Sequence, residues 1–224
     1  MPMNDVAPDL QQCWKHLSRA LTAELPKGSV CTWPHSTDTG FWFEIINVKP
    51  GARFEAKLHV TPGQTISLIS VNAFSPRRQY ARHLLRGLCA AAPMLGIATF
   101  DLTATRVGAW LWGRAGFAPC ASDWNGHLKQ QIWSRLELIE SDLPPHVAFN
   151  MHRALQSRDP TAFWTLCDTT TPIQGASLGY YLCADTNRFE DASWIGALSL
   201  RNDQQRERLH AYCWPTTSSA PRPA

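Results

Sequence analysis

The sequence has no large excess of charge of either sign and few charged residues overall. Among its 224 residues, 21 are Lys or Arg and 18 are Asp or Glu, which gives a formal net charge of +3 and a charged fraction of 17%. Nucleic-acid binding driven by electrostatics needs a more basic chain, so we expect no specific nucleic-acid partner. Hydrophobic residues make up 44% of the chain, which is ample for a packed core and argues against disorder.

The sequence also lacks a hydrophobic run long enough to cross a membrane. The longest uncharged apolar stretch, Gly87 to Phe100, is broken by Pro93 and falls short of the roughly 20 residues that a transmembrane helix needs. Met1 to Asp5 contain neither the basic nor the apolar segment of a secretory signal peptide. We therefore predict no membrane span and a cytoplasmic location, or export by a route that needs no signal peptide.

Paired cysteine motifs are absent. The seven cysteines stand at irregular spacing and never form a Cys-x-x-Cys pair, which favours a reducing compartment over a disulfide framework. Cysteines and histidines do not cluster at the spacing of zinc ligands either, so we expect no metal site.

The first part of the chain changes from a helical pattern to a strand pattern. Residues 9–25 carry hydrophobic side chains at helical spacing and are followed by Pro26 and Gly28, which predicts an amphipathic helix. Residues 41–74 contain β-rich runs separated by Pro-Gly turns. The middle run alternates strictly between hydrophobic and polar residues, as a strand with one buried face does.

The third β-rich run changes phase along its length. Ile66 and Leu68 share one parity, whereas Ile69, Val71 and Ala73 take the other. One extra residue in a β-bulge produces this shift, and the alternative is that the pattern is merely irregular. We interpret the shift as a bulge.

The following segments predict a parallel strand pairing. Residues 78–92 have a helical pattern, residues 97–104 form a buried strand, and residues 107–115 form a short helix that ends at Gly116. A strand–helix–strand unit of this length requires parallel pairing with a right-handed crossover. The fold class is therefore α+β with a mixed sheet, in which an antiparallel meander joins a parallel strand–helix unit.

The sequence beyond Pro119 is predicted to be mainly helical. A helix is expected to begin with an N-cap at Asp159 and Pro160. Other expected elements are helices over 128–139 and 204–212 and a strand over 178–184. We divide the chain into a core (1–120), an α-rich C-terminal extension packed on it (121–214) and a disordered tail (215–224).

One segment carries the strongest motifs. It contains a bulged strand, an Arg-rich turn, a helix with the pair Leu84-Leu85, and a short helix that finishes Arg114-Ala115-Gly116-Phe117. This order, from Thr65 to Pro119, resembles the acyl-CoA-binding half of the GNAT-type N-acetyltransferase superfamily. The upstream helix and strands follow the same order, so the resemblance covers roughly residues 10–120. It implies a GNAT-like fold, acetyl-CoA as co-substrate, and transfer of the acyl group to an amine.

The resemblance also implies where acetyl-CoA binds. In this family the bulged strand splays from its neighbour and pairs with the pantetheine arm, and the next loop offers amide N–H groups at a helix N-terminus to the pyrophosphate. Arg77, Arg78 and Arg82 can add charge-assisted contacts, or they can form a solvated basic face. The implied cofactor-binding residues are Val71, Asn72, Ala73, Phe74, Arg77, Arg78, Gln79, Tyr80, Ala81 and Trp112.

Two positions depart from the family's pattern. In the loop pattern Gln/Arg-x-x-Gly-x-Gly/Ala, the three defined places are taken by Pro76, Gln79 and Ala81, so the middle glycine is replaced. In the last helix, Trp112 takes the place of a tyrosine whose phenol can protonate the CoA thiolate, and an indole N–H is not a usable acid. These departures leave open a binding module that has kept the fold and lost the chemistry.

Amine acetylation needs a general base and a donor for the thioester carbonyl. Glu44 is the first candidate for the base, because it is a carboxylate on a strand otherwise apolar on both faces, unless it pairs with Arg53. His59, on the polar face of the middle run, is the second candidate, unless it is simply exposed.

The parallel strand supplies the remaining candidates. Asp101 either faces the slot or satisfies nearby backbone groups. Thr105 and Arg106 follow the carboxyl end of this strand, where open α/β sheets bind ligands. The predicted catalytic residues are Glu44, Asp101, Thr105 and Arg106, and the expected acceptor is an amine on a protein or other macromolecule, since the C-terminal extension exceeds what a small acceptor needs.

A third interpretation relies on cysteine chemistry. Cys31 with His35, or Cys120 with His127, can supply a nucleophile and a base, with Asp38 or Asp123 to orient the base. The protein would then be a signal-less effector or toxin with hydrolase activity.

Overall fold

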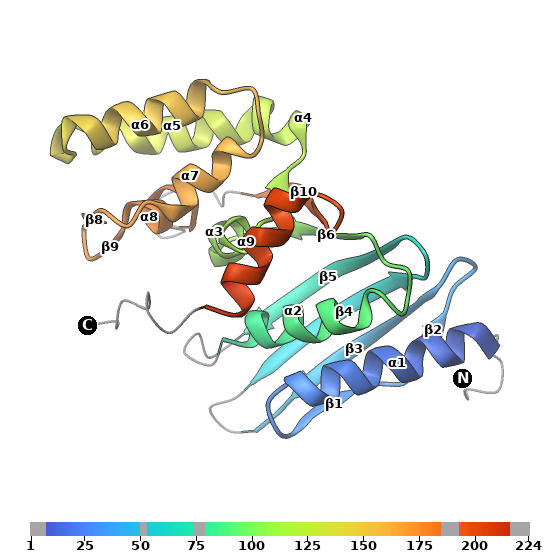
Figure 1. Ribbon diagram of the computed structural model, residues 1–224. Helices are drawn as coiled ribbons and strands as arrows, with labels where there is room; N and C mark the ends of the chain where they lie inside the picture. Colours follow the sequence, from blue (N-terminus) through green and yellow to red (C-terminus); the bar gives the residue numbers. More distant parts are fainter. Residues whose placement is uncertain (1–7, 50–52, 74–78, 185–192, 216–224) are drawn as a thin grey trace. The chain divides into compact units, whose positions relative to one another are not determined.

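The chain divides into two units. The computed structural model describes residues 8–49, 53–73, 79–184 and 193–215 (Figure 1). Unit 1 comprises Met1–Leu102, Ser199–Arg201 and His210–Ala224, and unit 2 comprises Thr103–Leu198 and Asn202–Leu209. The boundary at residue 120 that the sequence suggests stays a prediction.

Unit 1 is built on a mixed sheet. Its strands run in the order β1-β3-β4-β5-β6, with β2 paired to β3, and only the β5–β6 pair is parallel among the described strands of this unit. The elements are α1 (Pro8–Glu24), β1 (Ser29–Cys31), β2 (His35–Ser36), β3 (Phe41–Asn47), β4 (Phe54–Thr61), β5 (Thr65–Ala73), α2 (Tyr80–Ala91) and β6 (Thr99–Ala104). The predicted mixed sheet is confirmed, as are the helices over α1 and α2.

The core of unit 1 lies between this sheet and the helices α1 and α2, which cover the same face of it (Figure 1). Phe43 is fully buried, and its ring centroid lies 4.9 Å from that of Trp14 on α1. Phe54 on β4 stacks on Tyr80 of α2 at 4.8 Å. Alternate residues of β3 and β4 point into this core, because successive side chains of a strand face opposite sides.

The other face of the sheet is polar and half-buried. Trp42 lies between two neighbours on this face: the His35 ring stacks on it at 4.1 Å, and the Lys57 ammonium lies 4.2 Å from its centroid. His59 Nε2 lies 3.3 Å from the Thr37 hydroxyl. The contacts with His35 and Lys57 hold the indole of Trp42 against the sheet surface.

Unit 2 is mainly helical. Its elements are α3 (Val107–Arg114), β7 (Ala118–Pro119), α4 (Ala121–Asp123), a π-helical turn (Trp124–Leu128), α5 (Lys129–Glu137), a 3-10 turn (Glu140–Asp142), α6 (Pro145–Gln156), α7 (Ala162–Asp168), β8 (Pro172–Ile173), β9 (Ala176–Ser177), α8 (Leu178–Ala184), β10 (Trp194–Ser199) and the first part of α9 (Asp203–Cys213). Strand β7 pairs with β10, and β8 pairs with β9, both antiparallel.

Three helices of unit 2 approach one another closely. A Cβ atom placed on Gly179 of α8 would lie 2.5 Å from the Cys167 carbonyl oxygen on α7, and one on Gly113 of α3 would lie 2.6 Å from Cys167 Sγ. Arg135 of α5, which is 2% exposed, donates to the Leu182 carbonyl oxygen at 2.7 Å. The glycines at positions 113 and 179 let the backbones of α3, α7 and α8 pack closely.

The predicted strand over 178–184 is wrong, because these residues form the helix α8. Every residue of α8 except Tyr180 is buried, so the segment shows no polar face, and a short apolar run of this kind does not distinguish a buried helix from a buried strand. The predicted helix start at Asp159 and Pro160 is also displaced, since α7 begins at Ala162. Asp159 Oδ1 instead accepts from the Thr161 N–H at 2.9 Å in the preceding turn.

The predicted helices corresponding to α3, α5 and α9 are confirmed, whereas α6 and β10 were not predicted. The proposed tail lies, from residue 216 onward, outside the described residues. No helix in the described part of the chain is long and apolar enough to cross a membrane.

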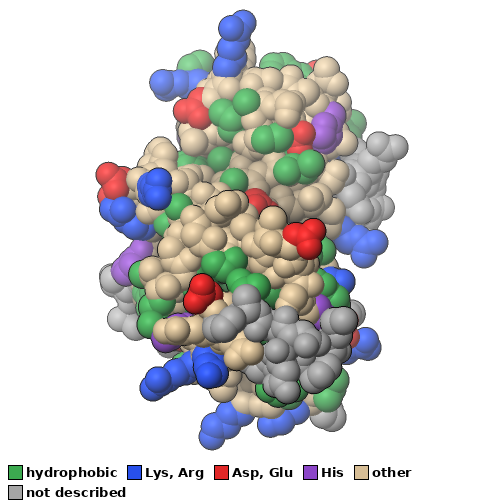
Figure 2. Space-filling model, turned by 90° about the vertical axis from the view of Figure 1, so that its right-hand side faces the viewer, with side chains coloured by type: hydrophobic (Ala, Val, Ile, Leu, Met, Phe, Trp, Pro, Cys, Tyr) green, Lys and Arg blue, Asp and Glu red, His purple; other side chains and the backbone are tan. Residues whose placement is uncertain are grey.

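Charged side chains of both signs are dispersed on the face shown in Figure 2. Lys and Arg side chains lie singly or in small groups there, and the described residues form no continuous basic patch on this face. The surface therefore reflects the near balance of basic and acidic residues in the composition.

Candidate functional site

Strand β5 carries a β-bulge at Ile69. Lys57 of β4 is paired with Ser70 and Leu58 with Leu68, so Ile69 is an extra residue without a partner on β4. Ile69 is 52% exposed, whereas Ile66 and Leu68 before it are buried. The bulge predicted from the change of phase is confirmed.

The parallel pairing of β5 ends at this bulge. The pairing with β6 begins with Thr65 opposite Thr99 and ends with Leu68 opposite Leu102. No further β5–β6 pair follows among the described strands. Strand β5 continues to Ala73, paired only with β4. Over residues 69–73, one edge of β5 thus offers backbone N–H and C=O groups that no described strand uses.

The start of α2 follows this free edge in the chain. Gln79, the N-cap residue, has φ 52° and ψ 34°, which is the left-handed conformation. Glycine adopts this conformation without steric cost, and any other residue pays for it. Gln79 therefore holds a backbone conformation in which glycine would be unstrained.

Two polar atoms in the first turn of α2 are buried without a hydrogen-bond partner among the described residues. They are Arg82 Nε and His83 Nδ1. The Arg82 guanidinium also donates to Gln79 Oε1 and lies 5.3 Å from the Tyr212 ring centroid. A cation and unsatisfied nitrogens at a helix N-terminus form an environment that favours an anion.

The other predicted cofactor-binding residues differ in exposure. Val71 is half-buried and Asn72 is exposed on β5, whereas Tyr80 and Ala81 at the start of α2 are buried. Ala73 is the last residue of β5. The predicted residues Phe74, Arg77 and Arg78 lie outside the described residues.

Glu44 lies on the polar face of β3, cross-strand from Lys57. Its carboxylate has no hydrogen bond or ion pair within the described residues, because Arg53 binds Glu55 instead, at 3.0 Å. Glu44 is two strands from β5, which is about 10 Å across the sheet. An acceptor amine near Glu44 would therefore lie on the polar face rather than at the strand edge itself.

Asp101 on β6 has a structural partner. Its Oδ2 accepts a hydrogen bond from the Thr65 hydroxyl at 2.8 Å, which links β5 and β6 across their parallel pair. Asp101 is in register with Ser67, and Ser67 with His59, so these three residues form one row across the polar face. The strand register creates this row, and the linear sequence has no signal for it.

The predicted residues of unit 2 lie at α3. Thr105 and Arg106 precede this helix and are exposed, and Arg106 has φ 53° and ψ −133°, a conformation unusual for any residue but glycine. Trp112 is 6% exposed and packs edge-on against Phe117, with ring centroids 5.5 Å apart. Trp112 is thus part of the core of unit 2.

The structure does not join either predicted cysteine–histidine pair by a hydrogen bond. Burial raises the pKa of the Cys31 thiol to about 11, and the His35 ring stacks on Trp42. In the second pair, Cys120 Sγ lies 3.1 Å from the Ser122 hydroxyl, and His127 Nε2 lies 2.9 Å from the Ser193 carbonyl oxygen.

The two acidic residues predicted to orient these histidines, Asp123 and Asp38, have different surroundings. Asp123 Oδ2 accepts from the Ile195 N–H at 2.6 Å, which holds α4 to β10, and Asp38 is exposed. All seven cysteines are free thiols. Within the described part of the chain, no three His, Cys, Asp or Glu side chains gather where they could hold a metal ion.

Comparisons of the chain with protein-family models, with curated proteins and with solved structures each give no match.

Proposed function

We propose that the protein is an acyltransferase that moves an acetyl or other acyl group from its CoA thioester to an amine. The observation that carries this proposal is the end of the β5–β6 pairing at the Ile69 bulge, which leaves one edge of β5 over residues 69–73 without a partner strand in the described part of the chain. The pantetheine arm has two amide groups, and it binds this edge as an added strand would, through backbone hydrogen bonds.

The start of α2 supports binding of the CoA phosphates. Arg82 Nε and His83 Nδ1 are buried and have no hydrogen-bond partner among the residues that the structure describes, and Gln79 holds its backbone in the left-handed conformation. Arg77 and Arg78 stand just before this turn in the sequence. A pyrophosphate at this helix end would satisfy the free N–H groups and gain charge-assisted hydrogen bonds from the arginines.

The proposed transfer is a single displacement. The amine nitrogen attacks the thioester carbonyl carbon, the C–N bond forms, the C–S bond breaks, and the CoA thiolate leaves with the electron pair. Glu44, whose carboxylate has no partner among the described residues, lies about 10 Å across the sheet from β5 and receives, through intervening water molecules, the proton that the ammonium group loses. Water protonates the thiolate, since Trp112 replaces the family's tyrosine and is buried, and the hydroxide that remains takes the second proton of the new amide nitrogen.

The acceptor is proposed to be an amine on a protein or another macromolecule. Unit 2 exposes the side chains of Leu138, directly after α5, and of Phe149 on α6. It thus provides apolar surface that a small amine would not require.

Titration calorimetry with acetyl-CoA and with CoA tests the binding part of this proposal. The double variant Arg77→Ala/Arg78→Ala should bind at least about tenfold more weakly, since one charge-assisted contact contributes about 1.5–3 kcal/mol. The matched control is Lys15→Ala/Arg19→Ala, which removes two exposed charges from α1 and should leave the affinity unchanged. Equal affinity in both variants would remove Arg77 and Arg78 from the site.

A second measurement separates catalysis from binding. CoA release is followed in the presence of polyamine and lysine-rich peptide acceptors, for the wild type and for Glu44→Gln. If turnover falls in Glu44→Gln while the affinity for acetyl-CoA is unchanged, the result supports Glu44 as the general base. Binding without turnover by the wild type would point to the degenerate binding module, which the replacement of tyrosine by the buried Trp112 favours.

A further inference from the structure

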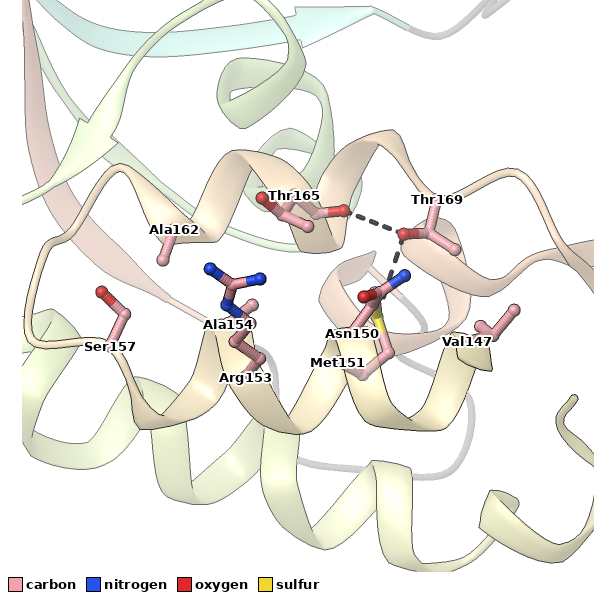
Figure 3. Close-up of a pocket in the computed structure, with 9 residues that line it drawn as sticks. All are labelled: Val147, Asn150, Met151, Arg153, Ala154, Ser157, Ala162, Thr165 and Thr169. Atoms are coloured by element: carbon pink, nitrogen blue, oxygen red, sulfur yellow. Dashed lines mark hydrogen bonds between the residues drawn. The ribbon is translucent and has the colours of Figure 1, made fainter. Parts of the chain in front are cut away.

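Unit 2 contains a groove between α6 and α7 that the proposed acyl transfer does not use. Figure 3 shows side chains of α6 reaching toward α7, with residues of both helices along its length. The groove has a volume of about 430 Å³, within the range of small-molecule binding sites.

The floor of the groove is apolar. Val147, Met151 and Ala154, which lie on one face of α6, are 9%, 2% and 7% exposed, and Ala162 continues this surface on α7. Such a surface accommodates the hydrocarbon part of a ligand, because it removes apolar area from water.

The rim of the groove carries hydrogen-bonding groups that are not used. The Arg153 guanidinium and the Asn150 carboxamide have no hydrogen bond or ion pair within the described residues, and Figure 3 shows both directed toward α7. The Thr165 hydroxyl lies on the α7 side of the groove. The Thr165 carbonyl oxygen accepts a hydrogen bond from the Thr169 hydroxyl at 2.8 Å. The groove therefore combines a cation, an amide and a hydroxyl.

The charge of Arg153 is not balanced by a carboxylate in the groove. No Asp or Glu is among the described residues that line it. Two of the acids near α6 in the sequence have other partners: Glu140 binds His152 at 2.8 Å, and Asp159 Oδ1 accepts from the Thr161 N–H. By contrast, Arg208 of the same unit is paired with Asp168 at 2.8 Å.

We propose that this groove binds a small organic carboxylate. The carboxylate takes paired hydrogen bonds from the planar guanidinium of Arg153, a geometry in which the two groups match. Asn150 donates a further hydrogen bond, and the hydrocarbon part lies on Val147, Met151 and Ala154. This site is separate from acyl transfer and does not depend on CoA binding.

Titration of the full chain with hexanoate tests the proposal, with hexanamide and inorganic phosphate as comparison probes. Hexanamide lacks the charge, and phosphate lacks the hydrocarbon part, so each should bind at least about tenfold more weakly than hexanoate. The key variant is Arg153→Gln, and its matched control is Arg158→Gln, which removes the charge of an exposed arginine outside the groove lining.

We expect Arg153→Gln to weaken hexanoate binding at least about tenfold, Asn150→Ala about threefold, and Arg158→Gln less than about twofold. Arg153 and Asn150 are exposed, so both variants should keep the wild-type melting temperature, which circular dichroism checks. The proposal is overturned if hexanoate shows no saturable binding, if either comparison probe binds as tightly, or if Arg153→Gln and Arg158→Gln have equal effects.

Discussion

Unit 1 and unit 2 bury their cores in different ways. In unit 1, one face of a sheet is covered by α1 and α2, and the other face is polar, so neighbouring residues such as Trp42 and Phe43 have different environments. In unit 2, helices approach at Gly113 and Gly179, where a single Cβ atom would overlap the opposite helix. Stability depends on side-chain volume on one face in unit 1, and on close backbone approach in unit 2.

The largest effect we predict comes from the buried face of unit 1. Phe43→Ala should lower the free energy of unfolding by about 3–5 kcal/mol, because it leaves a cavity against Trp14. Trp42→Ala, one residue earlier on the polar face, should cost less than half as much although tryptophan is larger. Urea unfolding followed by circular dichroism measures both. Equal losses of unfolding free energy in the two variants would mean that the buried face and the polar face of the sheet contribute equally to stability.

A smaller effect is expected from the helix contacts of unit 2. Gly113→Ala should cost about 1–3 kcal/mol, because its Cβ would meet Cys167 Sγ at 2.6 Å and the Phe163 ring at 2.7 Å. Gly108→Ala, on the same helix, meets only the Trp112 ring, at 3.2 Å or more, so its gain in helix propensity should keep the change within about 0.5 kcal/mol.

The same urea unfolding experiment compares these glycine variants. If Gly108→Ala destabilises the protein as much as Gly113→Ala, then Gly113 is not required for the close approach of α3 and α7.

The smallest predicted effect has the opposite sign. Gln79→Gly should raise the free energy of unfolding by about 0.5 kcal/mol, because release from the left-handed strain of about 1–2 kcal/mol outweighs both the backbone entropy that glycine loses and the exposed hydrogen bond from Arg82 to Gln79 Oε1. Gln12→Gly, the same substitution at an exposed position within α1, should lower it by about 1 kcal/mol. A loss of stability in both variants would argue against the αL conformation at Gln79.

The contrast between the units also explains what the sequence could predict. In unit 1, strict alternation in β4 and the phase change between Leu68 and Ile69 correctly predict the strands and the bulge, because one face of each strand meets water. In unit 2, α8 is buried on nearly all sides, so its residues have no polar period, and the predicted strand there is wrong.

The candidate site could be predicted only in part. The bulge and the start of α2 follow from local patterns, and the strand register then determines which side chains meet. The Thr65–Asp101 hydrogen bond and the row from His59 through Ser67 to Asp101 depend on pairings between distant segments. No local spacing contains that information.

Hydrogen exchange of the β5 amides, with and without acetyl-CoA, tests most directly whether CoA binds along the edge of β5. Binding along the free edge predicts slower exchange for the segment Ile69 to Asn72, with little change in Phe41 to Ile45 of β3, two strands away. Unchanged exchange at Ile69 to Asn72 under saturating acetyl-CoA would contradict the account, because the bulged edge would then not be where CoA binds.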